Sequence, residues 1–129
     1  MSAANPILTQ LPNKVAFHEA LESNPGVIII KFGAEWCGPC KKIEEHVHIL
    51  MNSMPSNVQS YIIDIDESVE VYSFLKTKKM VKAIPSILAY YKNDEATYIP
   101  DDIVIGADPV AINEFFERSF VKAKSISID

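Results

Sequence analysis

Two cysteines, Cys37 and Cys40, are the residues of this 129-residue chain whose type and spacing most clearly indicate chemistry. Cysteines three positions apart at the start of a helix lie on one face, where they can close a small disulfide ring with little backbone movement. Cys37 is expected at the positive end of the helix, which favours its thiolate and makes it the nucleophile toward a disulfide in another molecule. Cys40, one turn further and less exposed, is expected to attack the mixed disulfide and release the reduced substrate.

The residues around the cysteines support a reactive pair. Pro39 follows Gly38, lacks an amide hydrogen where the first helical turn has no acceptor for one, and stiffens the ring through its fixed φ. Zinc needs four ligands, but there is no second cysteine pair, and His46 and His48 would diverge on a helix. A pair of unreactive core cysteines would leave Trp36 and the Gly38-Pro39 dipeptide unexplained. No metal site is predicted.

The elements that must position the pair alternate along the chain. Strands are expected over residues 7–11, 27–32, 58–65, 86–91 and 97–105. Helices are expected from the Asn13 cap to the Asn24-Pro25-Gly26 turn, over 37–51, after Asp66-Glu67-Ser68 to a lysine-rich end, and from Asp108-Pro109. The apolar 27–32 run reads as a buried central strand, and the last helix is expected to bury Val110, Phe115, Phe116 and Phe120. This order predicts an α/β fold whose central mixed sheet is flanked by helices on both faces.

Composition indicates one ordinary globular domain. Hydrophobic residues make up 48% and charged residues 22%, and the net charge of −5 argues against a nucleic-acid binder. No charged segment precedes an apolar one near the amino terminus, and the strongest apolar run, 27–30, stops at Lys31, far short of the roughly 20 residues of a membrane-spanning helix. A soluble single domain over 1–129 is expected, with a core of about 7–121 and a short tail over 122–129.

Three segments carry a resemblance to a known family. Phe32-Gly33-Ala34-Glu35-Trp36-Cys37-Gly38-Pro39-Cys40-Lys41 resembles the active-site segment of the thioredoxin family. Ala83-Ile84-Pro85-Ser86 resembles its loop with a cis proline facing the disulfide, and Gly106-Ala107 resembles the glycine segment that completes the substrate groove. The resemblance covers roughly 7–121. It implies a thioredoxin fold with catalytic Cys37 and Cys40, supporting roles for Trp36, Gly38, Pro39 and Pro85, and a groove of Trp36, Ile84, Pro85, Gly106 and Ala107. Lys31 is also expected to support the cysteines, although it departs from the family pattern.

The resemblance also implies a biological setting. It predicts a protein-disulfide reductase without a bound cofactor, which acts on disulfide-containing proteins and is regenerated by a separate reductase carrying flavin and nicotinamide. A monomer in the cytoplasm that serves electron transport and cell redox homeostasis is expected, with no nucleic-acid or membrane partner. One alternative remains open, a binding module whose groove holds an extended peptide while the disulfide is incidental. The resemblance, together with the need for a tight turn that presents backbone groups to an extended substrate, predicts that the Ile84-Pro85 bond is cis.

Several positions depart from the family pattern. Lys31 stands where a buried aspartate is usual beneath the second cysteine, Ile62 where that aspartate's lysine neighbour is usual, and Glu45 where a helix-kinking proline is usual. The segments before Pro85 and Gly106 are also longer than in the simplest members. A protonated Lys31 would favour the Cys40 thiolate, or a neutral one could act as its base, with Glu44 or Glu45 as its expected carboxylate partner. The alternative is that its stem lies inside while its ammonium reaches water.

Overall fold

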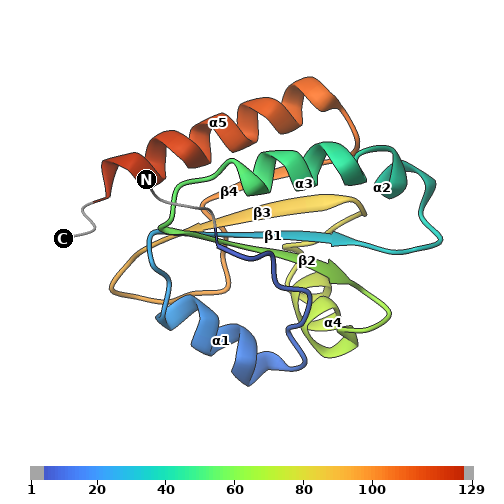
Figure 1. Cartoon of the computed structure of the whole chain (residues 1–129). Helices are drawn as coiled ribbons and strands as arrows, with labels where there is room; N and C mark the ends of the chain where they lie inside the picture. Colours follow the sequence, from blue (N-terminus) through green and yellow to red (C-terminus); the bar gives the residue numbers. More distant parts are fainter. Residues whose placement is uncertain (1–4, 127–129) are drawn as a thin grey trace.

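The computed structural model describes residues 5–126, in which four strands form one mixed sheet between two layers of helices (Figure 1). The elements are α1 (Lys14–Glu22), β1 (Val27–Gly33), α2 (Gly38–Lys42), α3 (Glu44–Asn52), β2 (Val58–Asp64), α4 (Val69–Thr77), β3 (Ser86–Tyr91), β4 (Asp102–Ile105) and α5 (Pro109–Ser125). The sheet order is β2-β1-β3-β4, with β1 parallel to β2 and antiparallel to β3. Helices α1 and α4 cover one face and α3 and α5 the other, which confirms the predicted architecture.

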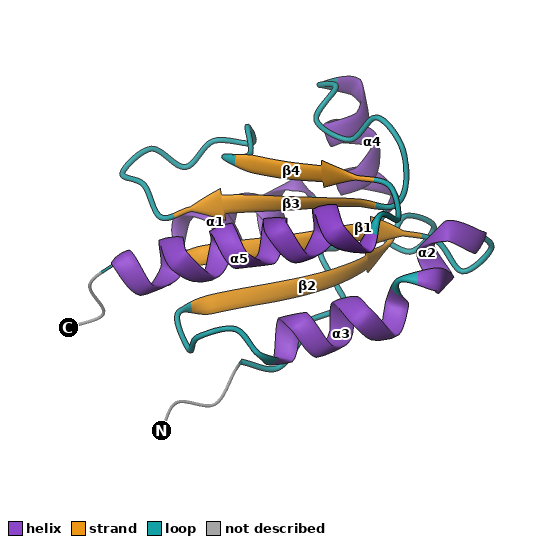
Figure 2. Ribbon diagram, turned by 90° about the horizontal axis from the view of Figure 1, so that it is seen from above, coloured by secondary structure: helices purple, strands orange, loops and turns teal. Residues whose placement is uncertain are grey.

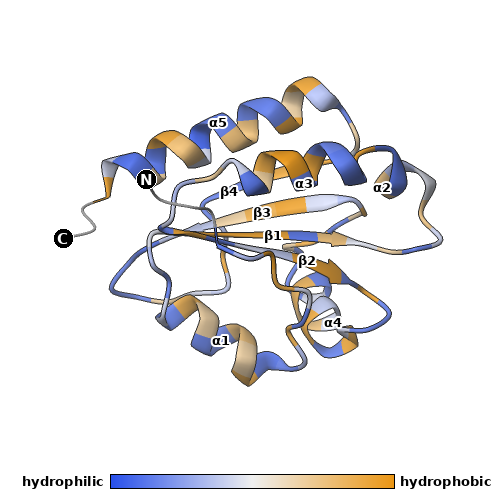
Figure 3. Cartoon of the chain, viewed as in Figure 1, coloured by the Kyte–Doolittle hydropathy of each residue, from blue (hydrophilic) through white to orange (hydrophobic). Residues whose placement is uncertain are grey.

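The central strand β1 separates two hydrophobic clusters. All seven of its residues are buried, as expected for a strand with a neighbour on each side and helices on both faces. Ile28 and Ile30 pack into the cluster beneath α1 and α4, whereas Val27 and Ile29 pack into the cluster beneath α3 and α5. Helix α5 alternates between hydrophilic and hydrophobic colours in Figure 3, as expected of a helix with one face on the sheet. In the described residues, no helix has the length and apolar character needed to cross a membrane.

Two of the predicted strands are wrong in extent. Residues 7–11 form only an isolated parallel bridge between Leu8 and Tyr61, because Pro6 and Pro12 on either side cannot donate to a longer ladder. The predicted 97–105 strand is limited to β4. Before it, an Asp101 side-chain oxygen accepts the Tyr91 backbone N–H at 2.7 Å, which takes a donor that would otherwise continue the hairpin.

The predicted 37–51 helix is interrupted at Ile43, which separates α2 from α3. Ile43 has φ −106° and ψ 2°, outside the helical range, although no proline lies at this point. Cys40 packs into the cluster beneath α1 and α4, whereas Ile43 and Val47 pack into the opposite cluster. The interruption lets consecutive turns of this segment serve two different cores, which helical periodicity alone does not reveal.

The caps of α1 and α5 follow the prediction, and the buried face of α5 follows it in part, since Phe115 and Phe116 are buried as predicted. Ser68 stands at the N-cap of α4 but makes no side-chain cap hydrogen bond. Asn13 accepts the Ala16 N–H at 2.9 Å and Asp108 accepts the Val110 N–H at 3.0 Å, so both cap their helices. Val110 and Phe120, predicted to be internal, are 64% and 39% exposed. Residues three or four positions apart on a helix share a face, and the face that contains Phe115 and Phe116 is the buried one. The buried residues of α5 are Ile112, Phe115, Phe116, Ser119 and Ala123. The helix continues to Ser125, past the expected end of the core at residue 121.

Gly26→Ala is expected to lower the free energy of unfolding by about 1–3 kcal/mol, because an added methyl group overpacks the entry to β1. A Cβ at Gly26 would lie 2.6 Å from Asn57 Nδ2 and 2.7 Å from Asn57 O. Asn57 cannot easily withdraw, since it is buried, its amide donates to Ala123 O at 2.9 Å and its carbonyl accepts the Val27 N–H at 3.1 Å. Urea unfolding measures the effect.

The matched control is Gly38→Ala, where an added Cβ has no neighbour within 4 Å. Its unfolding free energy is expected to stay within about 0.5 kcal/mol of the parent value. Equal stability losses in the two variants would contradict the close approach of Gly26 and Asn57.

Candidate active site

Cys37 and Cys40 lie where the chain leaves the central strand and turns into α2 (Figure 2). They form a disulfide with a Cα–Cα distance of 5.3 Å, within the ordinary range for such bridges. Cys37 is the N-cap of α2, and its Sγ accepts the Cys40 backbone N–H at 3.3 Å. Because α2 has only five residues, its own dipole is small, and this direct contact with a backbone N–H is a local interaction that favours negative charge on the Cys37 sulfur.

Trp36 lies at the surface next to the disulfide, and a residue in the loop after β2 binds its side chain. Its side chain is 68% exposed, and its Nε1–H donates to Asp66 Oδ2 at 2.7 Å. From the sequence, Asp66 is expected only to precede a helix, and this contact with Trp36 is not predicted. A signal was present, since β1 and β2 are parallel neighbours and the residues that follow them therefore meet at the same edge of the sheet.

The cis-proline loop and the glycine segment come together at this edge. The Ile84-Pro85 bond is cis, which confirms the prediction. Pro85 O accepts the Gly106 N–H at 2.8 Å, and Gly106 has φ +96°, a left-handed conformation that suits glycine. Because Phe32 pairs with Ser86, Pro85 lies next to the end of β1 and so beside the segment that carries the cysteines. The structure thus gathers Trp36, Ile84, Pro85, Gly106 and Ala107 around one edge of the sheet.

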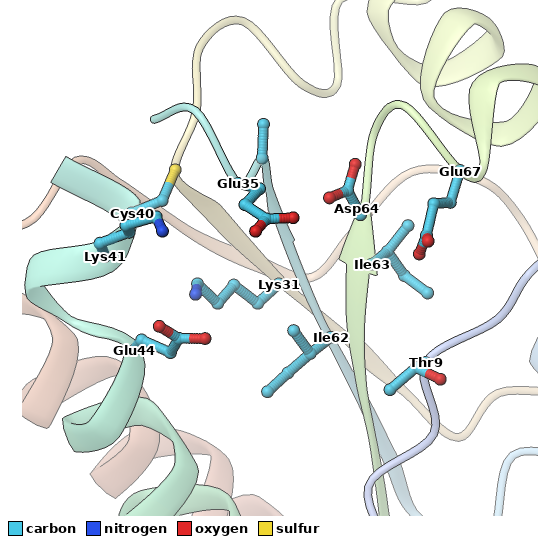
Figure 4. A pocket seen from close by; sticks show the side chains of 12 residues that line it. Thr9, Lys31, Glu35, Cys40, Lys41, Glu44, Ile62, Ile63, Asp64 and Glu67 are labelled. Carbon is cyan, nitrogen blue, oxygen red and sulfur yellow. The ribbon is translucent and has the colours of Figure 1, made fainter. Parts of the chain in front are cut away.

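A cavity of about 400 Å³ opens beneath Cys40 on the side of α3 and β2 (Figure 4). Its walls include charged side chains from five different segments and one buried cation; the lining residues are Thr9, Lys31, Gly33, Ala34, Glu35, Cys40, Lys41, Glu44, Ile62, Ile63, Asp64 and Glu67. Within residues 5–126, no three His, Cys, Asp or Glu side chains come together as a metal-binding group.

Lys31 is the buried cation of this cavity. It is only 4% exposed, and its side chain extends toward Cys40 and Glu44 (Figure 4). Burial lowers the pKa of Lys31 from its ordinary value, and the Glu44 carboxylate opposes this by raising it. Of the two carboxylates considered from the sequence, Glu44 lines the cavity and Glu45 does not. Ile62, the register partner of Lys31 on β2, offers it no polar atom.

Comparison with known proteins finds one consistent family. The family model described as Thioredoxin matches residues 9–115. Thioredoxin-2 of Saccharomyces cerevisiae is 31% identical over 108 residues, which cover 84% of this chain and 94% of that protein. The oxidized mitochondrial thioredoxin 3 of Saccharomyces cerevisiae is 29% identical with a TM-score of 0.67, covering 86% of this chain and 94% of the other. Plasmodium falciparum thioredoxin is 28% identical with a TM-score of 0.67, and the match covers 85% of this chain and 84% of that protein.

Asp66→Ala is expected to free the Trp36 indole and to lower the anisotropy of its fluorescence, which is directly readable because Trp36 is the chain's single tryptophan. Both partners lie at the surface, so the free energy of unfolding should change by no more than about 1 kcal/mol. Asp66→Asn is the control, since its amide oxygen can still accept the indole N–H. Anisotropy that stays unchanged in Asp66→Ala would show that this hydrogen bond does not hold the ring.

Proposed function

The chain belongs to the thioredoxin family, and we propose that Cys37 is the nucleophile and Cys40 the resolving cysteine of its exchange reaction. The protein is a thiol-disulfide oxidoreductase, an enzyme that reduces protein disulfides. The observation that supports the two roles is the position of the Cys37–Cys40 disulfide, with one sulfur capping α2 and the other inside it above a cavity.

The asymmetry of the two sulfurs supports this assignment. Cys37 Sγ already accepts a backbone N–H, an interaction that strengthens when the sulfur carries negative charge. Its thiolate attacks a client disulfide, forms a mixed disulfide and expels one client sulfur as a thiolate. Cys40 then attacks Cys37 Sγ, so the second client sulfur leaves and the Cys37–Cys40 bond returns. Two electrons pass from the dithiol to the client.

The protein substrate is proposed to bind along the edge of the sheet where the cis-proline loop lies. Trp36 offers a broad exposed ring, Ile84, Gly106 and Ala107 are half-buried, and Pro85 holds the turn between them. An extended peptide fits such a surface, because it can place apolar side chains against these residues while its disulfide reaches Cys37. We assign Trp36, Ile84, Pro85, Gly106 and Ala107 to this groove, with Gly38 and Pro39 shaping the turn between the cysteines.

The partners follow from the chemistry of the cycle. Oxidised enzyme needs two electrons for each client, and members of this family receive them from reductases. We propose a separate reductase that carries flavin and nicotinamide, and a monomeric enzyme that works in the cytoplasm and contributes to electron transport and cell redox homeostasis. One of the compared structures is a mitochondrial protein, so imaging of the tagged chain tests the compartment. The binding-only alternative gains no support from the relatives.

The proposal is tested by turnover. Insulin serves as a model protein disulfide, with NADPH and a thioredoxin reductase supplying electrons. We expect NADPH consumption to exceed the amount of enzyme many times, with reduced insulin chains formed in proportion. A protein with both cysteines changed to serine is the blank. Consumption of no more than one equivalent of NADPH per enzyme would contradict a catalytic cycle.

The two single serine variants are expected to fail differently. Cys37→Ser should lower the rate of insulin reduction by more than about a thousandfold, because it removes the attacking thiolate. Cys40→Ser should retain the attack but accumulate a mixed disulfide between Cys37 and insulin, since nothing resolves it. Mass spectrometry of acid-quenched samples identifies the adduct. Normal turnover by Cys40→Ser, or an adduct held by Cys40 in Cys37→Ser, would reverse the assigned roles.

A further inference from the structure

Lys31 is a buried cation for which the exchange reaction described so far has no use. Within residues 5–126 its side chain has no hydrogen bond, and no carboxylate oxygen lies within 4.0 Å of its Nζ. In the same residues, Ser119 Oγ alone among side-chain nitrogen and oxygen atoms is both fully buried and unpartnered. The Lys31 Nζ therefore retains contact with solvent, through the cavity into which its side chain extends. This agrees with the alternative that the lysine stem lies inside while its amine reaches water, and it also places the amine at the cavity beneath Cys40.

Gly33 brings Lys31 close to the Cys40 sulfur. A Cβ built on Gly33 would lie 3.3 Å from Cys40 Sγ and 3.9 Å from Lys31 Cε, so the sulfur and the end of the lysine stem adjoin the same small volume. Figure 4 shows the Lys31 nitrogen between Cys40 and Glu44. The missing side chain at position 33 thus leaves room for the lysine to approach the sulfur from below.

The other charges that face this cavity are more exposed than Lys31. They come from the segment after β1, from α2, α3 and β2, and from the segment after β2, and they are Glu35, Lys41, Glu44, Asp64 and Glu67. Asp64 is half-buried and the others are exposed, so water screens them more strongly than it screens Lys31. From β3, the register partner of Lys31 is the apolar Ile87. Lys31 is therefore the least solvent-screened of the ionisable groups that line the cavity beneath Cys40.

We propose that Lys31 stabilises the thiolate of Cys40 during resolution, so that the attacking state is a thiolate–ammonium pair. This inference rests on the proposed role of Cys40 as the resolving cysteine. If the amine is neutral, the Cys40 proton passes to it; if the amine is already an ammonium, the proton passes to water, and both routes reach the same pair. The Cys40 thiolate then forms a bond to Cys37 Sγ, and the client sulfur leaves with its electron pair and takes a proton from water.

The sign of the effect follows from Coulomb attraction. An ammonium near Cys40 lowers the pKa of its thiol, so the thiolate is available at a lower pH than it would be otherwise. Burial works against the charge on Lys31, and the Glu44 carboxylate partly restores it. Lys31 does not touch the client, so it is a positioning residue that acts through Cys40.

Direct titration of Cys40 tests the proposal. In the reduced Cys37→Ser background, which leaves one thiol, absorbance at 240 nm follows Cys40 ionisation, and the double-serine protein provides the blank that subtracts tyrosine. Adding Lys31→Met should raise the pKa of Cys40 by about one unit, because it removes the neighbouring ammonium while filling a similar volume. Lys31→Arg should keep the pKa close to the background value, since it keeps the charge.

Lys41→Met is the matched control, because Lys41 lines the same cavity but is exposed. It changes the net charge by the same amount and should leave the Cys40 titration in place. An unchanged titration in Lys31→Met, or an equal shift in Lys41→Met, would overturn the proposal and reduce Lys31 to a structural residue.

Single-turnover kinetics with both cysteines present separates this inference from the exchange reaction itself. Release of the second insulin sulfur should be about threefold slower in Lys31→Met at pH values below the Cys40 pKa, because a tenfold smaller thiolate fraction is partly offset by the greater nucleophilicity of a more basic thiolate, and its pH profile should move upward by about one unit. Release with the parent pH profile would overturn the role of Lys31 and leave the exchange reaction intact. If the parent protein released no insulin, the exchange reaction would be overturned, while the Cys40 titration would still decide the role of Lys31.

Discussion

The complete burial of β1 is the constraint on which the rest of the structure depends. The strand pairs with β2 on one side and β3 on the other, and both of its faces are covered by hydrophobic clusters. Its end is therefore fixed in position, and the chain that leaves it carries Cys37 to the edge of the sheet. The same edge receives Asp66 from the segment after β2 and Pro85 from the loop just before β3. One strand thus aligns the reactive sulfur, the tryptophan's anchor and the cis-proline loop.

The parts of the fold that depend on local chemistry could be predicted from the sequence. The Asn13 cap, the apolar β1 run and the cis bond before Pro85 each follow from a few neighbouring residues or from the family resemblance. The interruption at Ile43 could not be predicted in this way, because it depends on which of two cores each side chain enters. The early end of the hairpin likewise depends on Asp101 capturing a backbone donor ten residues away.

In the candidate site, too, the features set by a short motif could be predicted from the sequence, and those that depend on contacts between distant segments could not. The cysteine pair is contained in a four-residue motif, and its identity and geometry agree with what the motif predicts. The Trp36–Asp66 hydrogen bond and the cavity around Lys31 depend instead on parallel strands that bring distant segments together. The sequence led us to expect a carboxylate partner for Lys31. Glu44 lines the same cavity, but no carboxylate oxygen lies within 4.0 Å of the Lys31 Nζ, so the expected ion pair does not form within residues 5–126. A changed charge beneath Cys40 is then compatible with unchanged dithiol chemistry, because a carboxylate can accept the proton of the Cys40 thiol as a base, whereas an ammonium stabilises the Cys40 thiolate by Coulomb attraction.

The equilibrium reduction potential of the Cys37–Cys40 couple tests most directly the claim that this enzyme reduces protein disulfides. It is measured by equilibrating the protein in dithiol/disulfide buffers of known potential and counting free thiols by alkylation and mass spectrometry. A reductant must lie below the glutaredoxin range, and we predict a potential close to the roughly −270 mV of thioredoxins. A potential above about −180 mV, the range of enzymes that form or isomerise disulfides, would contradict the claim.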